Sequence, residues 1–276
     1  MIKQWYLKEL AISKTLKKGD KGKEVEKIQQ WLCIWGENNP TCGCSTKIDG
    51  DYGEATFNAV KAFQAFKKIP LSGVVNQATF DALCSPLSQA HANIKLANNA
   101  TVRDYVLAYA RAHLANGARE LQYDGKSNVG PWVRSYMLGN EGKDWFWCAG
   151  FVTTILDLAA SKFNKRFDST IPNRFGCDTI TDFAIAHNSY ISAAKINANP
   201  ALVKPGDLFI VRRPTVGKWV YGWEHIGIVT EVLNGVFKTI EGNTNTNGSS
   251  NGIAVYARTR SYANNSMDVI SIQNMV

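Results

Sequence analysis

Apolar side chains recur at helical spacing in three stretches of the first third of the chain, and a glycine-containing turn precedes each stretch. The stretches lie within residues 16–32, 48–64 and 71–83. Apolar residues three or four positions apart predict one buried face per helix, and the glycines predict loops between helices. Three repeats of this turn-then-helix unit indicate a small three-helix bundle. The polar stretch after it contains Pro86 and has no clear period, so residues 85–98 are predicted to be a linker.

Helical patterns continue in the middle of the chain. A helix is predicted to begin near Thr101, because Asp104 three residues later completes a capping pattern. A loop over residues 123–131 and a short helix over 132–137 follow. Apolar residues at 151, 152, 155, 156 and 159 then predict a buried helix whose first turn contains Cys148.

After about residue 200 the pattern changes to short apolar runs separated by turns. The runs lie at residues 203–212, 225–232, 236–241, 253–256 and 268–272, and they predict an antiparallel meander. Helices followed by strands indicate an α+β fold. We therefore predict a first domain at residues 1–84, a linker at 85–98 and a second domain at 99–276.

Composition narrows the possible partners. The 276 residues carry a net charge of +8, which suits nucleic acid, an anionic membrane or an acidic wall polymer. The lysines are spread among acids, so a solvated surface explains the charge equally well, and we expect no nucleic-acid binding. No segment approaches the roughly 18 apolar residues of a membrane span. The first ten residues lack an apolar core, so we expect synthesis in the cytoplasm without a signal peptide.

Four of the six cysteines lie in the first third of the chain, at Cys33, Cys42, Cys44 and Cys84. Three interpretations remain open: buried reduced thiols, two structural disulfides, or a zinc site made of cysteines. Cys42 and Cys44 are expected to be too close to bond to each other, so any disulfide would involve Cys33 or Cys84.

The strongest chemical signal surrounds Cys148. A thiol at the first turn of a helix is exposed to the positive end of the helix dipole, which lowers its pKa. His225 lies later on a predicted strand, and Glu241 and Asn243 follow the next one. This order predicts a nucleophile, a base and an orienting group. Asn243 is the substitute if Glu241 is an ordinary strand-end carboxylate, and Cys148 could instead be an inert buried thiol.

Other residues near these segments allow two interpretations. Cys177 has no evident partner and is expected to be inert. Aromatic residues flank Cys148 and His225 and either form the wall of a substrate groove or belong to the core; they are Trp145, Trp147, Trp219, Tyr221 and Trp223. Trp147 and Trp223 are the predicted substrate-binding residues. No cofactor or metal site is predicted.

The first domain resembles the peptidoglycan-binding domains of wall hydrolases over roughly 70 residues. The matching motifs are Gly19-x-x-Gly22-x-x-Val25-x-x-Ile28-Gln29 and Asp49-Gly50-x-Tyr52-Gly53-x-x-Thr56-x-x-Ala59-Val60-x-x-Phe63-Gln64. The chain departs from the family in a cysteine-bearing insert at residues 38–47 and in Val75-Asn76, where a second glycine is usual. The resemblance implies that peptidoglycan is a partner.

The second domain resembles the CHAP family of cysteine- and histidine-dependent amidohydrolases and peptidases, which have a papain-like fold. The matching segments are Trp147-Cys148-Ala149-Gly150-Phe151-Val152, Pro205-Gly206-Asp207-Leu208, His225-x-Gly227-x-Val229 and Glu241-Gly242-Asn243-Thr244. The resemblance implies that Cys148 is the nucleophile, His225 the base, Glu241 the orienter and Asn243 a supporting polar group. Trp147 replaces a common glutamine that helps to bind the oxyanion, and no acidic calcium loop precedes Cys148.

The two resemblances together imply a monomeric enzyme that cuts an amide bond of peptidoglycan. The bond is either the N-acetylmuramoyl-L-alanine amide or a peptide bond of the stem or cross-link. We expect action in the periplasm or on the wall, as a phage lysin or as an interbacterial toxin with an immunity protein. The alternatives are a non-catalytic wall-binding protein that keeps the fold and a thiol enzyme acting on an amide outside the wall.

Overall fold

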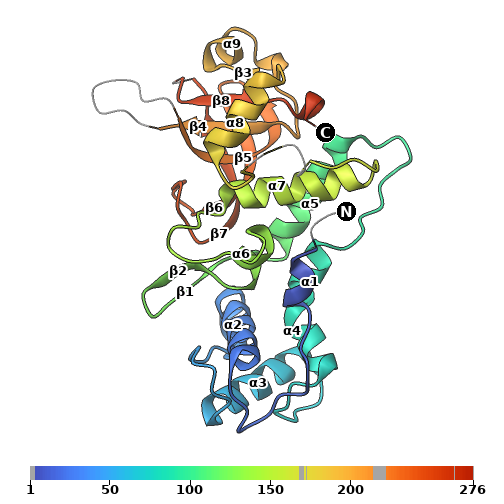
Figure 1. The fold of residues 1–276 in the computed structure, drawn as a ribbon, viewed down its shortest axis with the longest axis vertical. Coiled ribbons are helices and arrows are strands. Elements are labelled where there is room, and N and C mark those ends of the chain that lie inside the picture. Colours follow the sequence, from blue (N-terminus) through green and yellow to red (C-terminus); the bar gives the residue numbers. More distant parts are fainter. Residues whose placement is uncertain (1–3, 168–170, 172, 214–221, 264, 276) are drawn as a thin grey trace. The chain divides into compact units, whose positions relative to one another are not determined.

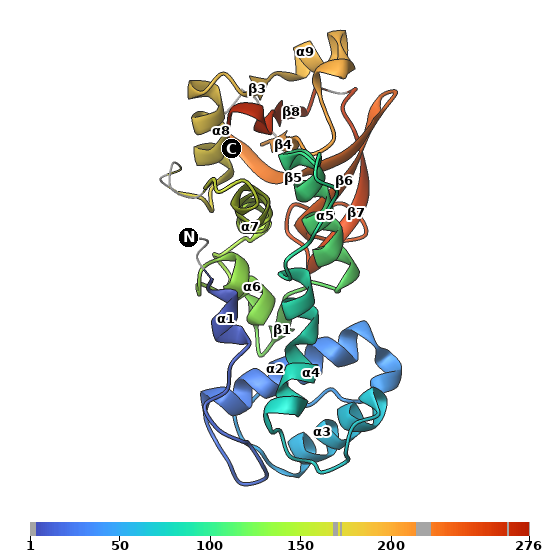
Figure 2. The ribbon, with the colours of Figure 1, turned by 90° about the vertical axis from the view of Figure 1, so that its right-hand side faces the viewer.

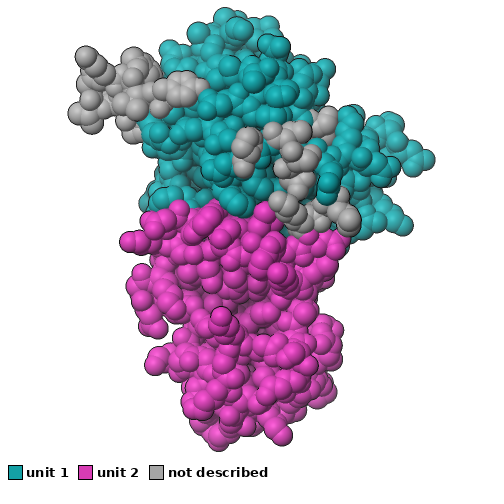
Figure 3. All heavy atoms as spheres, viewed as in Figure 1, with its two compact units in different colours: residues 1–3, 91–115, 146–276 teal, residues 4–90, 116–145 magenta. Residues whose placement is uncertain are grey.

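The computed structural model of the chain describes residues 4–167, 171, 173–213, 222–263 and 265–275. The chain divides into two compact units (Figure 3). Unit 1 comprises residues 1–3, 91–115 and 146–276, and unit 2 comprises residues 4–90 and 116–145. Helices and antiparallel strands are both present, so the α+β class is confirmed.

Unit 2 contains the three helices that the sequence predicts (Figure 1). They are α2 (Lys23–Asn38), α3 (Glu54–Lys67) and α4 (Gln77–Ala90), and α2 packs against both of the others. The helices bury the predicted apolar faces, including Trp31, Phe63 and Phe80. Helix α4 continues through Pro86 to Ala90, so its last residues fall within the segment predicted as a linker.

A buried glutamine joins each of the first two helices to the turn before the next helix. The Gln29 side chain of α2 donates to the Asp49 carboxylate at 2.9 Å and accepts the backbone N–H of Gly50 at 2.8 Å. The Gln64 side chain of α3 accepts the backbone N–H of Gly73 at 2.9 Å. Both amides satisfy buried backbone groups of a turn, which explains why the two repeats carry a glutamine at the same place.

The expected cysteine pairing is wrong. Cys42 and Cys44 form a disulfide with each other, with their Cα atoms 5.2 Å apart, while Cys33 and Cys84 are free and buried. The backbone turn between the two cysteines explains why they can bond. Gly43 between them has a φ of 61°, a left-handed conformation that glycine adopts without strain and that folds the chain back on itself.

Residues 116–145 of unit 2 form a hairpin and a short helix. The hairpin pairs β1 (Leu121–Tyr123) with β2 (Lys126–Val129), where the sequence predicted a loop, and α6 (Pro131–Tyr136) follows. Within the same unit, α6 lies beside α1 (Tyr6–Glu9) (Figure 1). Arg134 of α6 joins them, because its guanidinium donates to both carboxylate oxygens of Glu9 at 2.8 and 2.7 Å.

Unit 1 is built on one antiparallel sheet. Its strands are β3 (Tyr190–Ile191), β4 (Leu208–Arg212), β5 (Trp223–Leu233), β6 (Val236–Thr244), β7 (Ala254–Ser261) and β8 (Met267–Ile270). The order is β3-β8-β4-β5-β6-β7, so β4 to β7 form the predicted meander. The last strand departs from the prediction: β8 pairs with β4 instead of β7, which buries its four residues inside the sheet.

Helices cover this sheet and complete the core of unit 1. They are α5 (Val102–Ala115), α7 (Cys148–Ser161), α8 (Cys177–Ala186) and α9 (Ala193–Ala198), with short 3₁₀ turns at Pro200–Leu202 and Ile272–Asn274. Helix α7 packs against β5, β6 and α5 (Figure 2), and α8 packs against β5. The predicted cap of α5 is confirmed, because the Asp104 carboxylate accepts the backbone N–H of Thr101 at 2.8 Å. Among the described helices, none combines the length and apolar composition that a membrane crossing requires.

Candidate functional site

Cys148 is the first residue of α7, and Trp147 caps that helix. The helix is almost entirely buried, because ten of its fourteen residues are apolar or glycine, and it packs against β5 and β6. The free backbone N–H groups at a helix start carry partial positive charge, which favours a thiolate over a thiol. The sequence therefore positions Cys148 where its ionised form is stabilised.

His225 lies on β5 and is completely buried. Its ring nitrogen Nε2 is 3.0 Å from a carboxylate oxygen of Glu241 on β6. The other nitrogen, Nδ1, makes no hydrogen bond of good geometry with a described residue, but the Cys148 side chain lies close enough to interact with the imidazole. Nδ1 is thus the nitrogen available to the Cys148 sulfur.

Glu241 is held by more than the histidine. One carboxylate oxygen accepts the Arg260 Nε–H at 2.9 Å and the Thr239 hydroxyl at 2.5 Å, and the other accepts from His225 and from a second Arg260 nitrogen. The Glu241 side chain has no exposed surface. A buried carboxylate with this many charged and polar donors stays ionised and fixes the imidazole that it contacts.

These contacts determine the protonation states of Cys148, His225 and Glu241. The thiol pKa of Cys148 lies well below its usual value, because a hydrogen bond from Cys177 and interactions with His225 outweigh burial. Burial opposes the charged imidazole, but Cys148 and Glu241 raise the pKa of His225 to about 9. Burial also opposes the Glu241 carboxylate, but hydrogen bonds from Arg260 and His225 lower its pKa to about 2. Thiolate, imidazolium and carboxylate are the favoured forms at neutral pH.

A second thiol lies against Cys148. Cys177 is the first residue of α8, and its sulfur is 3.9 Å from the Cys148 sulfur. The pKa of the Cys177 thiol is raised well above its usual value by the hydrogen bond to Cys148 and by burial. Cys177 therefore keeps its proton and donates it toward the Cys148 thiolate, contrary to the expectation that it has no partner.

Cys148 and Cys177 both line one pocket of about 370 Å³. Apolar, charged and polar side chains form the rest of its lining: Phe146, Phe175, Trp223, Arg213, Glu224, Ser250 and Asn251. The Asp178 carboxylate of α8 holds two of these lining residues in place. It accepts the Trp223 backbone N–H and an Arg213 guanidinium N–H at 2.6 Å each. Trp223 is further fixed by its ring N–H, which donates to Asp268 at 2.9 Å. The lining of the pocket suits a molecule that has both apolar and charged groups.

The other predicted site residues lie in different surroundings. Trp147 is completely buried and packs near Gly242, so its ring is part of the core. Asn243 is buried too, and its side-chain amide makes no hydrogen bond with a described residue. Glu241 thus holds the histidine, and Asn243 does not. Trp223 lines the pocket, while Trp219 and Tyr221 lie outside the described residues.

Sequence reasoning missed Arg260 and Asp178 as well as Cys177. Arg260 is one of two arginines that alternate with short residues along β7, a pattern that only indicates a strand with one polar face. Cys177 did carry a signal, because it precedes a helical apolar pattern just as Cys148 does. Within the described ranges, no group of three His, Cys, Asp or Glu side chains could hold a metal ion.

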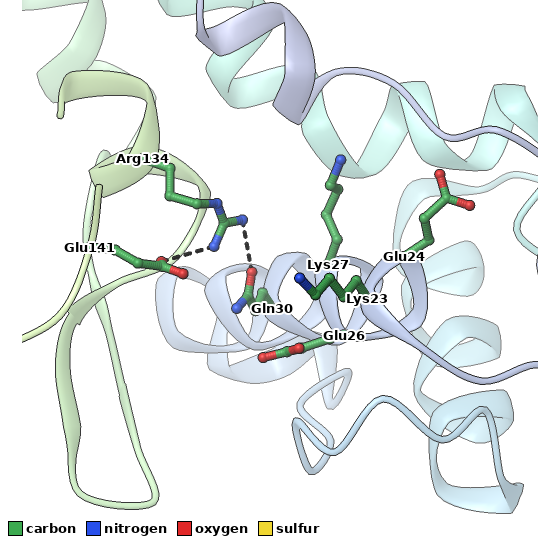
Figure 4. A pocket seen from close by; sticks show the side chains of 7 residues that line it. All are labelled: Lys23, Glu24, Glu26, Lys27, Gln30, Arg134 and Glu141. Carbon is green, nitrogen blue, oxygen red and sulfur yellow. Dashed lines mark hydrogen bonds and ion pairs between the residues drawn. The ribbon is translucent and has the colours of Figure 1, made fainter. Parts of the chain in front are cut away.

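Unit 2 carries a separate pocket of about 390 Å³. Arg134 and Glu141 face Lys23, Glu26 and Gln30 of α2 across it (Figure 4). Arg134 donates to the Glu141 carboxylate at 2.9 Å and to the Gln30 side-chain oxygen at 3.0 Å. Three of the polar groups that line this pocket are therefore already bonded to one another.

Comparison with known protein families gives a match in the N-terminal part of the chain. Residues 21–83 match the family described as "Putative peptidoglycan binding domain", a range that contains α2, α3 and the first half of α4. No curated protein sequence matches the chain. The match supports an N-terminal peptidoglycan-binding domain and an association of the protein with the cell wall.

Proposed function

We propose that this protein cleaves an amide bond of the peptidoglycan stem peptide by acyl transfer to Cys148. The proposal depends on one observation: the side chains of Cys148, His225 and Glu241 are buried and interact in series beside one pocket. A nucleophile beside a base that a third group orients is the arrangement required for covalent catalysis. The peptidoglycan-binding domain in the same protein supports peptidoglycan as the substrate.

The reaction follows from the protonation of the three groups. The Cys148 thiolate attacks the carbonyl carbon, and the oxygen that becomes negative is stabilised by the Cys148 backbone N–H at the start of α7. The His225 imidazolium gives its proton to the leaving nitrogen, which departs as an amine and leaves a thioester. Neutral His225 then takes a proton from water, whose oxygen attacks the thioester and releases the acid and the thiolate.

Glu241 acts through His225. Its carboxylate accepts the Nε2–H, so the ring is oriented with Nδ1 toward the sulfur and its positive charge is balanced. Arg260 prevents the carboxylate from taking the proton itself, because two guanidinium hydrogen bonds stabilise the charged form of Glu241. The proton therefore stays on the His225 imidazole, which can give it to the leaving nitrogen.

The pocket suits a stem peptide better than a glycan. Arg213 and Glu224 provide charges of both signs, and Phe146, Phe175 and Trp223 provide apolar surface. Stem peptides combine carboxylates, amines and short apolar side chains. The N-acetylmuramoyl-L-alanine amide and a peptide bond of the stem or cross-link both meet this description. A phage lysin or an interbacterial toxin would use either activity.

Digestion of purified peptidoglycan by the full chain tests the proposal. We expect the wild-type protein to release fragments whose masses identify the cut amide, and we expect Cys148→Ala to release none while still pelleting with the wall. Cys84→Ala is the matched control, since this thiol is buried in unit 2 and should not affect release. Fragment release by Cys148→Ala at the wild-type rate would refute the mechanism. Binding by the wild type without any release would favour a non-catalytic wall protein.

A further inference from the structure

Two thiols meet at the starts of two different helices. Cys148 begins α7 and Cys177 begins α8, twenty-nine positions apart in the sequence, with their sulfurs 3.9 Å apart. Both cysteines line the same pocket, so a small molecule that enters it lies beside the two residues. The proposed hydrolysis uses only the first thiol, so the second requires another explanation.

We propose that Cys148 and Cys177 form a reversible disulfide, with a low-molecular-weight disulfide such as oxidised glutathione as the co-reactant. A disulfide requires its two sulfurs about 2.05 Å apart. The 3.9 Å separation is closed by about 2 Å of side-chain movement. Rotation about the Cα–Cβ bonds at two helix starts can supply this movement without unfolding either helix.

The exchange is balanced in two steps. The Cys148 thiolate attacks one sulfur of the oxidant, forms a mixed disulfide and expels one thiolate, which takes a proton from solvent. The Cys177 thiol then loses its proton to solvent, its sulfur attacks the Cys148 sulfur, and the second small thiolate leaves and is protonated. In total, two protein thiols are oxidised by two electrons, and one small disulfide is reduced to two thiols.

The charges around the pair favour this order of attack. Cys148 is the ionised thiol of the two, so it reacts first. Its negative charge is one reason that Cys177 holds its proton. The mixed disulfide removes that charge, which makes Cys177 easier to ionise and ready to resolve the intermediate. Arg213 also lines this pocket, and its guanidinium is paired with the Asp178 carboxylate.

The other free thiols provide a comparison within the same molecule. Burial raises the pKa of Cys33, and burial also raises the pKa of Cys84 to about 12. Both therefore remain protonated at neutral pH and react slowly with a disulfide. Among the four free thiols, oxidation should be confined to the pair at the pocket.

The functional consequence depends on the proposed hydrolysis at Cys148. A sulfur held in a disulfide cannot attack a carbonyl, so oxidation would silence the protein and reduction would restore it. The disulfide itself does not depend on that function, because its formation needs only the two thiols and the oxidant. A mass readout and an activity readout therefore test the two ideas separately.

The experiment treats the reduced full chain with oxidised glutathione at neutral pH, blocks remaining thiols with N-ethylmaleimide and maps the peptides without reduction. We expect a Cys148–Cys177 linked peptide in the wild type and in Cys84→Ala. In Cys177→Ser, or Cys177→Ala if the serine variant does not fold, Cys148 should instead keep one glutathionyl group. A folded wild type that retains glutathione on Cys148, or leaves Cys148 free to alkylate, overturns the proposal.

The same samples are then added to peptidoglycan. We expect oxidised wild type to lose fragment release and to regain it with dithiothreitol. Unchanged release from fully linked protein would overturn the regulatory consequence. If reduced wild type releases nothing although the linked peptide forms, the proposed hydrolysis fails and the disulfide pair stands.

Discussion

Replacing Glu241 by glutamine tests whether the carboxylate sets the charge of His225. Glutamine has nearly the same shape, so Glu241→Gln removes the negative charge and leaves the packing of β6 unchanged. The imidazole loses its charged partner at 3.0 Å, and Arg260 loses one of the two carboxylate oxygens that accept its hydrogen bonds. We expect the pKa of His225 to fall.

The size of the fall can be worked out from the structure. A pKa of about 9 instead of 6.5 corresponds to about 3 kcal/mol in favour of the imidazolium. Cys148 and Glu241 share this stabilisation, each through a hydrogen bond and a charge interaction. Because burial opposes the imidazolium, the two partners together contribute more than this net value. Half of it, about 1.5 kcal/mol, is therefore the least that Glu241 contributes, and its loss lowers the His225 pKa by at least about one unit.

Nuclear magnetic resonance of histidine-labelled protein measures this directly. The chain has four histidines, so the spectrum is simple, and His225→Gln identifies the signal of His225. Glu231→Gln is the control, because Glu231 lies exposed on β5 and should leave the titration unchanged. The reasoning fails if wild-type His225 titrates near 6.5, or if folded Glu241→Gln and wild type share one midpoint.

Two further predictions concern stability. The pKa of Glu241 is lowered from 4.5 to about 2, so its charge contributes about 3 kcal/mol above pH 4.5 that is lost as the pH falls through about 2. Urea unfolding at several pH values should show this loss in the wild type and less of it in Glu241→Gln. Gln64→Leu should cost about 2 kcal/mol in thermal unfolding, because the Gly73 N–H loses its buried acceptor. The exposed Gln77→Leu should change stability by less than about 0.5 kcal/mol.

The sequence predicted those parts of the fold that local pattern controls. The helices of unit 2 and helix α7 begin close to the predicted residues, because glycine turns and apolar spacing act over a few positions. The order of Cys148, His225 and Glu241 along the chain also predicted that they meet, since a helix start and two neighbouring strands place them. In the structure the Glu241 carboxylate lies 3.0 Å from Nε2 of the His225 imidazole.

Contacts between segments far apart in the sequence could not be predicted from local patterns. Strand β8 joins β4 across the sheet, which depends on burial of both its faces and not on its distance from β7 in the sequence. Cys177 and Arg260 reach the site through helix and strand packing that no local pattern records. The Cys42–Cys44 disulfide depends on a left-handed glycine, and the sequence showed the glycine without its conformation.

Two glycines explain why the predicted residues come together at this site. A Cβ at position 242 would lie 2.7 Å from the Phe151 Cβ of α7 and 3.0 Å from the Trp147 ring, so only glycine lets β6 approach the start of that helix. A Cβ at position 227 would lie 2.9 Å from the Glu241 Cγ, so the second glycine leaves room for the carboxylate beside β5. In both the His-x-Gly and the Glu-Gly segment, one residue is a site side chain and the glycine leaves the space that the site needs. Trp147 fits this arrangement as a packing residue: its buried ring fills the space above Gly242 and supports the turn from which Cys148 faces the pocket.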